Sequence, residues 1–340
     1  MSNQPFISYD SASLEQRVAV YAVPKALANA VPWLFLEKHA KKETLPKNKS
    51  DTLKWKRYVP FEVSTTTLVE GVVPSPDNFQ METVTDTIDQ FGKVVNVSDK
   101  FHDLHSDAGL NDIAAELGKN IGAVREALCW ETVRAGTQVI YSGTATARTG
   151  VEDIVTLNQI RQATNILAAN HGDFLTKMVG ASANTATEPV APSYIGVGSR
   201  DLDGDLRDLD KFVEAHKYGQ PGAALSEYEI GACEGVRFQL TPHLKPFLGA
   251  GSTTLTGIRS EGGVRADVYP LVIMAKDFWG ITTLAGSDSV KVNIVPPGKV
   301  SVGNELGQKG FASWMMYFCA TRLNERWGVR IETAASDFSA

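Results

Sequence analysis

The sequence predicts a mixed α+β fold that carries long extensions. Three observations lead to this prediction: an N-terminal arm broken by prolines, a polar β-ribbon over residues 52–100, and one long helix over residues 107–142. A two-stranded ribbon without an apolar face is marginal by itself, so it needs another surface to lie on. Both extensions are therefore expected to find a partner surface elsewhere.

Composition is typical of a globular protein with ample length for a core. The 340 residues are 43% hydrophobic and 21% charged, with 29 Gly and 15 Pro, which excludes a collagen, a coiled coil and a disordered chain. The net charge of −6 argues against a protein whose main role is to coat nucleic acid, because such proteins carry basic surfaces.

The charge is nevertheless uneven, because one segment is basic. Only Glu43 and Asp51 oppose eight cations there: Lys38, Lys41, Lys42, Lys47, Lys49, Lys54, Lys56 and Arg57. Three interpretations stay open for this segment: a solvated basic stretch, a contact to phosphates, and a contact to an acidic neighbouring subunit.

Cysteine usage and the first residues indicate where the chain is made. Cys129, Cys233 and Cys319 are scattered without CxxC or Cys/His spacing, which is typical of reduced core cysteines in a protein made in the cytosol. The start, MSNQPFISYD, lacks a basic and an apolar region, so we expect no signal peptide. No apolar run approaches the length of a membrane span.

Residues 1–51 are predicted to form the arm. Ser11–Tyr21 and Pro32–Lys41 are short helical candidates, and Pro24 and Pro32 keep each of them too short to be stable alone. The apolar side chains in the second candidate must therefore find a partner elsewhere: Leu34, Phe35 and Leu36.

The ribbon follows the arm. Eight of the 17 residues over Met81–Val97 are Val, Ile or Thr, which favours extended structure. Threonines fill one alternate face, whereas Asp86, Gln90 and Asn96 interrupt the other. Neither face is expected to be apolar.

The long helix has one apolar stripe with steps of three and four residues: Leu110, Ile113, Leu117, Ile121, Val124 and Leu128. Ser106 and Asp107 supply an N-cap, and Gly143 a stop. A second helix is predicted over Val151–His171.

The rest of the chain is predicted to be rich in strands. A strand at Tyr194–Val197 leads into a helix from about Asp201, and the final strands form a hairpin around Leu323–Arg326 that is buried on both faces. Further strands are expected at Gly235–Leu240, Val268–Ala275 and Val290–Val295.

No set of residues predicts catalysis, a cofactor or a metal. The acidic cluster Asp201–Asp210 lacks the glycine and the final carboxylate of a calcium loop, and carboxylates that stabilise a helix N-terminus explain it. His102 and His105 have HxxH spacing without a third ligand. The sequence contains no GxSxG, Walker or HExxH motif.

Six stretches, in order, resemble one protein family: LPKNKSDTLKWKRYVPF, TLVEGVVPSP, QFGKVVNVSD, YIGVGSRDLDGDLRDL, VYPLVIMAKDFWGITTLAG and NELGQKGFASWMMYFCATRLNERWGVRIE. They are similar to the HK97-type major capsid proteins of tailed bacteriophages. The branch they resemble is typified by the coliphage that packages its own giant RNA polymerase. In the fourth stretch Ser199, Arg200 and Asp201 replace the His-Pro-Asp usual in that branch.

The resemblance implies a fold with five parts. They are an N-terminal arm (1–51), an extended β-hairpin loop (52–100), a peripheral domain with the long spine helix (101–220), a mainly axial domain (221–305), and a C-terminal hairpin returning to the peripheral domain (306–340).

The implied function is structural rather than enzymatic. Hexamers and pentamers of the chain would form an icosahedral head shell around double-stranded DNA, without sequence-specific DNA binding or a membrane. The implied location is the virion, after synthesis in the host cytoplasm, and the implied partners are a scaffolding protein, a portal and a decoration protein. Two alternatives stay open: an encapsulin-like compartment shell, and a cytosolic α/β metal-dependent hydrolase that uses the Asp201–Asp210 cluster.

The arm and the ribbon are the expected intersubunit surfaces. The residues predicted to contact neighbouring subunits are Trp33, Leu34, Phe35, Lys54, Trp55, Lys56, Arg57, Tyr58 and Phe61.

Overall fold

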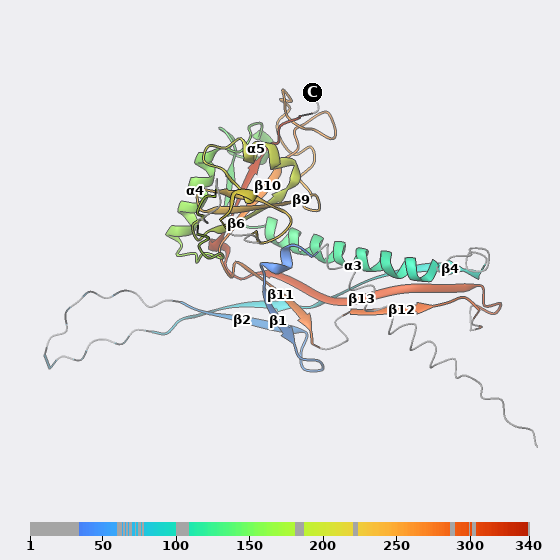
Figure 1. Ribbon diagram of the computed structural model, residues 1–340. Coiled ribbons are helices and arrows are strands. Elements are labelled where there is room, and N and C mark those ends of the chain that lie inside the picture. The colour runs from blue at the N-terminus through green and yellow to red at the C-terminus, as the bar shows by residue number, and fades with distance from the viewer. Residues whose placement is uncertain are drawn as a thin grey trace, which may run out of the picture.

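The computed structural model describes most of the chain beyond the first 33 residues. The described residues are 34–59, 63, 65, 67, 70, 71, 73, 76, 78–99, 109–180, 187–219, 224–285, 290–298, 300 and 304–338, with side chains from residue 113 onward in the long helix. Two sheets organise them. One lies in a rounded lobe, and the other runs along the long helix, while a two-stranded ribbon projects in the opposite direction from that sheet (Figure 1).

The lobe is built on a seven-stranded mixed sheet. Its strands, in spatial order, are β5 (Val139–Tyr141), β14 (Gly328–Thr333), β10 (Tyr269–Met274), β6 (Tyr194–Ser199), β9 (Val236–Thr241), β8 (Glu229–Cys233) and β7 (Val213–Glu214). The central strands are buried along their whole length, which explains their near-continuous apolar sequences.

Helix α4 (Leu157–Ala169) covers one face of this sheet. Its buried side chains Ile160, Ala163 and Leu167 recur at steps of three and four residues, as an amphipathic helix requires. Thr156 and Gln159 form a capping box that fixes where the helix begins. Beyond β6, a 3₁₀ turn leads into the short helix α5 (Asp203–Arg207).

The second sheet is long and narrow. Its strands are β1 (Lys41–Leu45), β11 (Trp279–Leu284), β13 (Lys309–Arg322), β12 (Val290–Val295) and β4 (Asp89–Ser98), and β13 pairs with three of the others. Helix α3 (Gly109–Arg134) lies along β13 (Figure 1). Alternate residues of β13 point into the core between helix and sheet: Ala312, Trp314, Met316 and Phe318.

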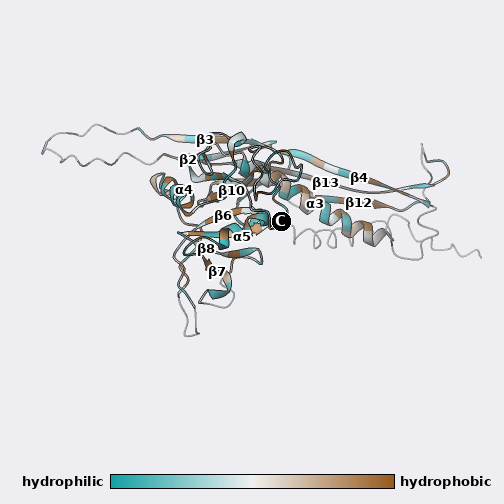
Figure 2. Ribbon diagram, turned by 90° about the horizontal axis from the view of Figure 1, so that it is seen from above, coloured by the Kyte–Doolittle hydropathy of each residue, from teal (hydrophilic) through white to brown (hydrophobic). Residues whose placement is uncertain are grey.

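The ribbon consists of β2 (Thr52–Tyr58) and β3 (Met81–Thr87), which pair in antiparallel register. Seen from above, it extends away from the lobe on the side opposite β12 (Figure 2). Contrary to the expectation of two polar faces, one face of the ribbon root is partly buried. Trp55 and Asp86 are buried and Leu53 is half-buried on that face, while Lys54 and Lys56 are exposed on the other.

Several predicted elements are confirmed. The strands at 194–199, 236–241, 269–274 and 290–295 lie within a residue or two of the expected positions. The ribbon, the long helix and the α+β class are also as predicted.

Three predicted elements need correction at their ends. The long helix ends at Arg134 instead of 142, because Val139–Tyr141 leaves it to pair with β14. The second helix begins at Leu157 instead of Val151, where the Thr156 cap lies. Within the described part of 32–41, only Leu36–Lys38 is helical, as a 3₁₀ turn, and β1 begins at Lys41.

The predicted C-terminal hairpin is wrong. Its two apolar runs are β13 and β14, but β13 lies in the long sheet and β14 in the lobe sheet, so they do not pair with each other. The expected boundary at residue 220 also differs from the structure, because the parallel pair β6–β9 crosses it. The lobe sheet instead takes strands from residues 139–274 and 328–333.

Among the residues that the structure describes, no helix is long and apolar enough to cross a membrane.

Candidate functional site

The arm is hydrogen-bonded to the spine helix α3 through a buried carboxyl group. The backbone N–H groups of Phe35 and Leu36 donate to Oε2 and Oε1 of Glu126 on α3, both at 3.1 Å. These amides lie at the start of the 3₁₀ turn Leu36–Lys38, where backbone donors have no partner within the helix. Phe35 and Leu36 are 2% and 0% exposed, so the arm here belongs to the core of its own chain.

The burial of Glu126 changes its titration. Burial disfavours the charged form and raises the pKa of Glu126 to about 8, although the amides of Leu36 and Phe35 oppose the shift. Arg125, the residue before Glu126, also contacts the arm. Its Nε lies 2.6 Å from Oε1 of Glu37, the residue that follows Leu36. Two adjacent residues of α3 therefore hold three consecutive residues of the arm.

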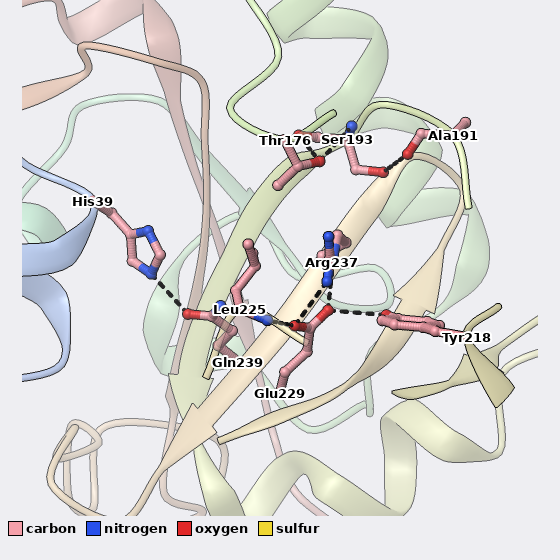
Figure 3. Close-up of polar contacts among 9 residues, drawn as sticks. All are labelled: His39, Thr176, Ala191, Ser193, Tyr218, Leu225, Glu229, Arg237 and Gln239. Carbon is pink, nitrogen blue, oxygen red and sulfur yellow. Dashed lines mark hydrogen bonds and ion pairs between the residues drawn. The ribbon is translucent and has the colours of Figure 1, made fainter. Parts of the chain in front are cut away.

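A second contact joins the arm to the lobe. His39 Nε2 lies 2.7 Å from Oε1 of Gln239, which is fully buried on β9 (Figure 3). Burial lowers the pKa of His39, and the bond to Gln239 opposes that shift. The imidazole is therefore neutral at neutral pH.

A fully buried ion pair lies beside this contact (Figure 3). Arg237 donates to Glu229 through Nε at 2.6 Å and Nη2 at 3.0 Å, and the two side chains are only 2% and 0% exposed. The Tyr218 hydroxyl and the backbone N–H of Leu225 also donate to Glu229, at 2.9 and 2.5 Å. This geometry satisfies both oxygens of the carboxylate, as a buried charge requires.

The root of the ribbon is packed on its own sheet. Trp55 is 8% exposed, and its ring lies against Gly280 of β11, where an added Cβ would be 3.1 Å from the indole. Lys41 Nζ lies 5.8 Å from the centre of the Trp55 ring. Glycine at 280 therefore leaves room for the tryptophan that anchors the ribbon.

A buried carboxylate strengthens this anchor. Asp86 on β3 accepts from Thr282 Oγ1 at 3.0 Å, from Cys319 Sγ at 2.7 Å and from Thr321 Oγ1 at 2.5 Å. These donors lie on β11 and β13, so one side chain ties the ribbon to two strands of the long sheet. Burial, with the bond to Asp86 as second cause, raises the pKa of Cys319 to about 12.

The outer face of the ribbon, which carries Lys54, Lys56 and Tyr58, is exposed and has both charged and aromatic side chains. Lys54 and Lys56 are exposed on it, and Tyr58 is 61% exposed. Tyr58 packs against Phe79, with ring centroids 4.9 Å apart, and pairs with the exposed Met81 across the ribbon. The outer face thus combines two ammonium groups with an exposed aromatic patch, as interaction surfaces do.

A groove of about 340 Å³ lies beside the spine helix. Leu128 from α3, Phe91 from β4 and Phe318 from β13 form its apolar wall. Two carboxylates, of Asp89 and Glu131, and one guanidinium, of Arg322, also line it, so its charge is weakly negative. Its charge and its apolar lining complement those of the outer ribbon face.

The structure separates the predicted contact residues into three groups. Phe35 and Trp55 are buried within their own chain, and Arg57 pairs with Glu82 across the ribbon; a neighbour contact of these three residues stays a prediction. Lys54, Lys56 and Tyr58 are exposed, and Leu34 is half-buried. Trp33 and Phe61 lie outside the described residues.

The acidic cluster is occupied by protein partners. Asp201 pairs with Arg259 at 2.6 Å, Asp203 with Arg207 at 2.7 Å, and Asp205 accepts from the backbone N–H of Ser336 at 2.9 Å. Within the described ranges, no group of three His, Cys, Asp or Glu is placed to hold a metal ion. These carboxylates of the cluster thus stabilise the structure around α5. The two histidines with HxxH spacing, His102 and His105, lie outside the described residues.

Sequence reasoning did not identify Glu126, Asp86 or the Glu229–Arg237 pair. Glu126 lies four residues before the buried Trp130, on the same face of α3. A charged residue on an apolar helix face is the sequence feature that could have pointed to its buried role. No such signal marks Glu229 or Arg237, because their partners are set by the register of β8 with β9.

Comparison by sequence gives no match, either to a protein-family model or to a curated protein. Comparison by structure gives matches over nearly the whole chain. A chain from the capsid of Ralstonia phage GP4 is 12% identical with a TM-score of 0.64, over 90% of this chain and 92% of that one. A chain from the capsid of cyanophage Pam1 is 10% identical with a TM-score of 0.62, over 99% and 96%.

A third match comes from the mature capsid of bacteriophage PhiM1, at 11% identity and a TM-score of 0.56, over 88% of this chain and 86% of that one. The chain therefore has the HK97-type fold of phage capsid proteins.

Proposed function

We propose that this chain is the major capsid protein of a tailed bacteriophage. Hexamers and pentamers of it form the icosahedral head shell that encloses double-stranded DNA, with no catalytic role. The observation that carries the proposal is the match to phage capsid chains over 86–99% of both lengths. A shared fold over the whole chain is stronger support than a shared domain, although fold alone does not fix function.

The exposed outer ribbon face supports self-assembly. A ribbon that leaves Tyr58, Phe79 and Met81 in solvent gains stability when a neighbouring subunit covers them. Lys54, Lys56 and Tyr58 are the proposed contact residues, and the groove around Asp89 and Glu131 is the surface on the next subunit that their charge and shape favour. Such a head-to-tail contact forms rings when its rotation closes, as the proposed hexamers and pentamers require.

Particle formation tests the proposal directly. The purified chain is examined by light scattering after size exclusion and by negative-stain electron microscopy, with a control in which residues 59–80 are replaced by a short Gly-Ser turn. We expect rings or shells for the full chain and none for the control. A full chain that stays at its single-chain mass of 36.8 kDa at high concentration, with or without phage head proteins, contradicts the proposal.

The ribbon–groove contact has a separate test. Lys56→Glu places like charges opposite Glu131 and should prevent assembly, and Glu131→Lys in the same chain should restore it. Lys177→Glu, at an exposed lysine of the lobe, serves as the matched control. If the double variant does not recover assembly, the ribbon does not bind this groove of the neighbouring subunit.

The contents of the particles distinguish a phage head from a compartment shell. A phage head assembled in infected cells contains double-stranded DNA, whereas an encapsulin-like shell contains cargo proteins. The expected partners of a head are a scaffolding protein, a portal and a decoration protein, and the expected location is the virion after synthesis in the host cytoplasm. Mass spectrometry of purified particles tests these partners.

Kinship with the branch typified by the coliphage that carries a virion RNA polymerase is a finer part of the proposal. The six stretches that resemble that branch support it, and QFGKVVNVSD includes most of β4. A very large RNA polymerase in the same virions would support this kinship, and virions without one would count against it.

A further inference from the structure

The ribbon is a two-stranded sheet of its own that projects from the rest of the chain (Figure 1). Strands β2 and β3 pair with each other, and the chain joins them to the long sheet through residues 46–51 before β2 and through Ile88 after β3. Such short connections allow a ribbon to swing about its root. The direction of the ribbon therefore depends on the side chains that hold its root against the long sheet.

Asp86 makes the polar contact at this root. It is 4% exposed, whereas every other residue of β3 is exposed or half-buried. Its carboxylate accepts from Thr282 Oγ1 of β11, and from Cys319 Sγ and Thr321 Oγ1 of β13. Thr282 and Cys319 are partners in the register of the two strands, so the donors are fixed points on one sheet.

These bonds fix an orientation as well as a position. The three donors are neutral, and such hydrogen bonds weaken steeply when they bend away from a straight line. Trp55, the other buried residue of the ribbon root, packs against Gly280 through apolar atoms, and apolar contact has no preferred direction. Asp86 therefore determines the angle of the ribbon more strictly than Trp55 does.

The outer face lies far enough from Asp86 to magnify a small rotation. Leu53 pairs with Asp86 and Tyr58 with Met81, so five residue steps separate the contact from Tyr58. At about 3.4 Å per residue, this distance is roughly 17 Å. A rotation of about 10° at the root would displace Tyr58 by roughly 3 Å, which is enough to separate packed side chains.

A contact that fixes the direction of the ribbon also fixes where its outer face meets a neighbour. We propose that Asp86 is a positioning residue for self-assembly: it sets the direction of the ribbon and hence the angle between adjacent subunits. The inference rests on the proposed self-assembly through the outer ribbon face. A closed shell needs subunit angles within a narrow range, so loss of this contact should give particles of mixed curvature.

The direction of the ribbon can be measured in the unassembled chain by pulsed electron paramagnetic resonance. Spin labels at Lys54→Cys on the ribbon and Lys119→Cys on α3, both exposed positions, report the distance between ribbon and spine helix. The natural cysteines are buried or half-buried, so brief labelling at about pH 7 selects the introduced ones. We expect a narrow distance distribution in the parent chain and one about twice as broad in Asp86→Ala, because the root is then free to swing.

Two further variants separate positioning from general stability. Asp205 is a buried aspartate of the lobe, 3% exposed, that accepts from the backbone N–H of Ser336 at 2.9 Å. Asp205→Ala should lower the urea midpoint without broadening the distance distribution. Thr282→Val removes one of the three donors and keeps the branched shape, so it should broaden the distribution less than Asp86→Ala. It also provides the test if Asp86→Ala does not fold.

Particle geometry tests the consequence for assembly. Electron microscopy measures the diameters of the particles that each chain forms. Parent and Asp205→Ala particles should share the same diameters, whereas Asp86→Ala should give an about twofold wider spread that includes open sheets. A merely structural role of Asp86 would lower the yield of particles in both aspartate variants and leave their diameters unchanged.

The possible outcomes are distinct. An unchanged distance distribution in Asp86→Ala overturns the inference, and so does equal broadening in Asp205→Ala. A broader distribution with particles of unchanged diameter also overturns it, because the direction of the ribbon then does not set the subunit angle. Absence of particles from the parent chain refutes the proposed function and with it a role of Asp86 in assembly, whereas the spin-label distances alone show whether Asp86 holds the ribbon.

Discussion

Glu126, in the second half of α3, accepts a hydrogen bond from the backbone amide of Leu36, which lies 90 residues earlier in the chain. The arm thus begins its course as part of the core between helix and sheet. This part of the arm, from Leu34 to Leu45, is therefore described as part of its own chain, and contacts of the arm with neighbours stay a prediction.

This contact makes stability dependent on pH. The pKa of Glu126 is raised from 4.5 to about 8 in the folded chain, so between these values the unfolded chain releases a proton that the folded chain keeps. The free energy of unfolding therefore falls as pH rises through this window. Urea denaturation at about pH 5 and about pH 8.5 should show the higher midpoint at the lower pH.

The Glu126→Gln variant provides the control for this dependence. Its amide oxygen still accepts from an arm amide, but the side chain does not titrate, so the pH dependence over this window should become flatter. An unchanged dependence would mean that another group causes it. His39 acts in the opposite direction, because its lowered pKa makes acidification below about 6.5 destabilising.

The buried pair Glu229–Arg237 should be a major contributor to the stability of the lobe. Arg237→Met leaves the Glu229 carboxylate buried without its cation and should cost about 3 to 5 kcal/mol of unfolding free energy. The more exposed pair Arg161–Glu234 is the matched control, and Arg161→Met should cost much less, because solvent screens this pair and Lys211 also pairs with Glu234. Chemical denaturation of the unassembled chain measures both.

The double variant Arg237→Met/Glu229→Met gives the sharper comparison. Removing both charges leaves no unpaired ion, so its loss should be smaller than the sum of the two single losses. Additive losses would show that the two side chains act independently, contrary to the bidentate geometry.

Close packing around Gly328 gives a further prediction. A Cβ at this position would lie 2.3 Å from two atoms of the Phe278 ring, which is 1% exposed and cannot move aside. Gly328→Ala should therefore cost about 1 to 3 kcal/mol in thermal or chemical denaturation. Gly180→Ala, where a Cβ meets nothing within 4 Å, should be close to neutral. Equal effects of the two changes would contradict this account.

Much of the fold could be predicted from local pattern. The buried strands of the lobe were found because Val, Ile and Leu run continuously in them, and α3 because its apolar residues recur at helical spacing. The path from β13 to β14 could not be found this way. A short turn between two apolar runs is the local pattern of a hairpin, and only tertiary packing sends β14 to β10 in the other sheet.

The candidate site was less predictable than the fold. Trp55 lies in a basic and polar stretch, so its burial in its own chain had no local signal, whereas the apolar run around Phe35 indicated burial but not which chain supplies the partner. Asp86 was read as an interruption of an apolar face, because aspartate is rarely buried without partners. Its three donors come from residues about 200 positions away, and sequence spacing gives no information on such contacts.

Burial, together with the same carboxylate, is expected to make Cys319 unreactive. Burial and donation to Asp86 raise the pKa of the Cys319 thiol to about 12, so little of it is thiolate at neutral pH. Because the thiolate is the nucleophile, iodoacetamide at about pH 8 should modify Cys319 much more slowly than an unperturbed cysteine. The Asp86→Asn variant removes the nearby charge and should increase the rate. Cys129, whose pKa is raised mainly by burial, is the control and should stay unreactive in both proteins. Rapid modification of Cys319 in the parent chain would show that its bond to Asp86 does not form in solution.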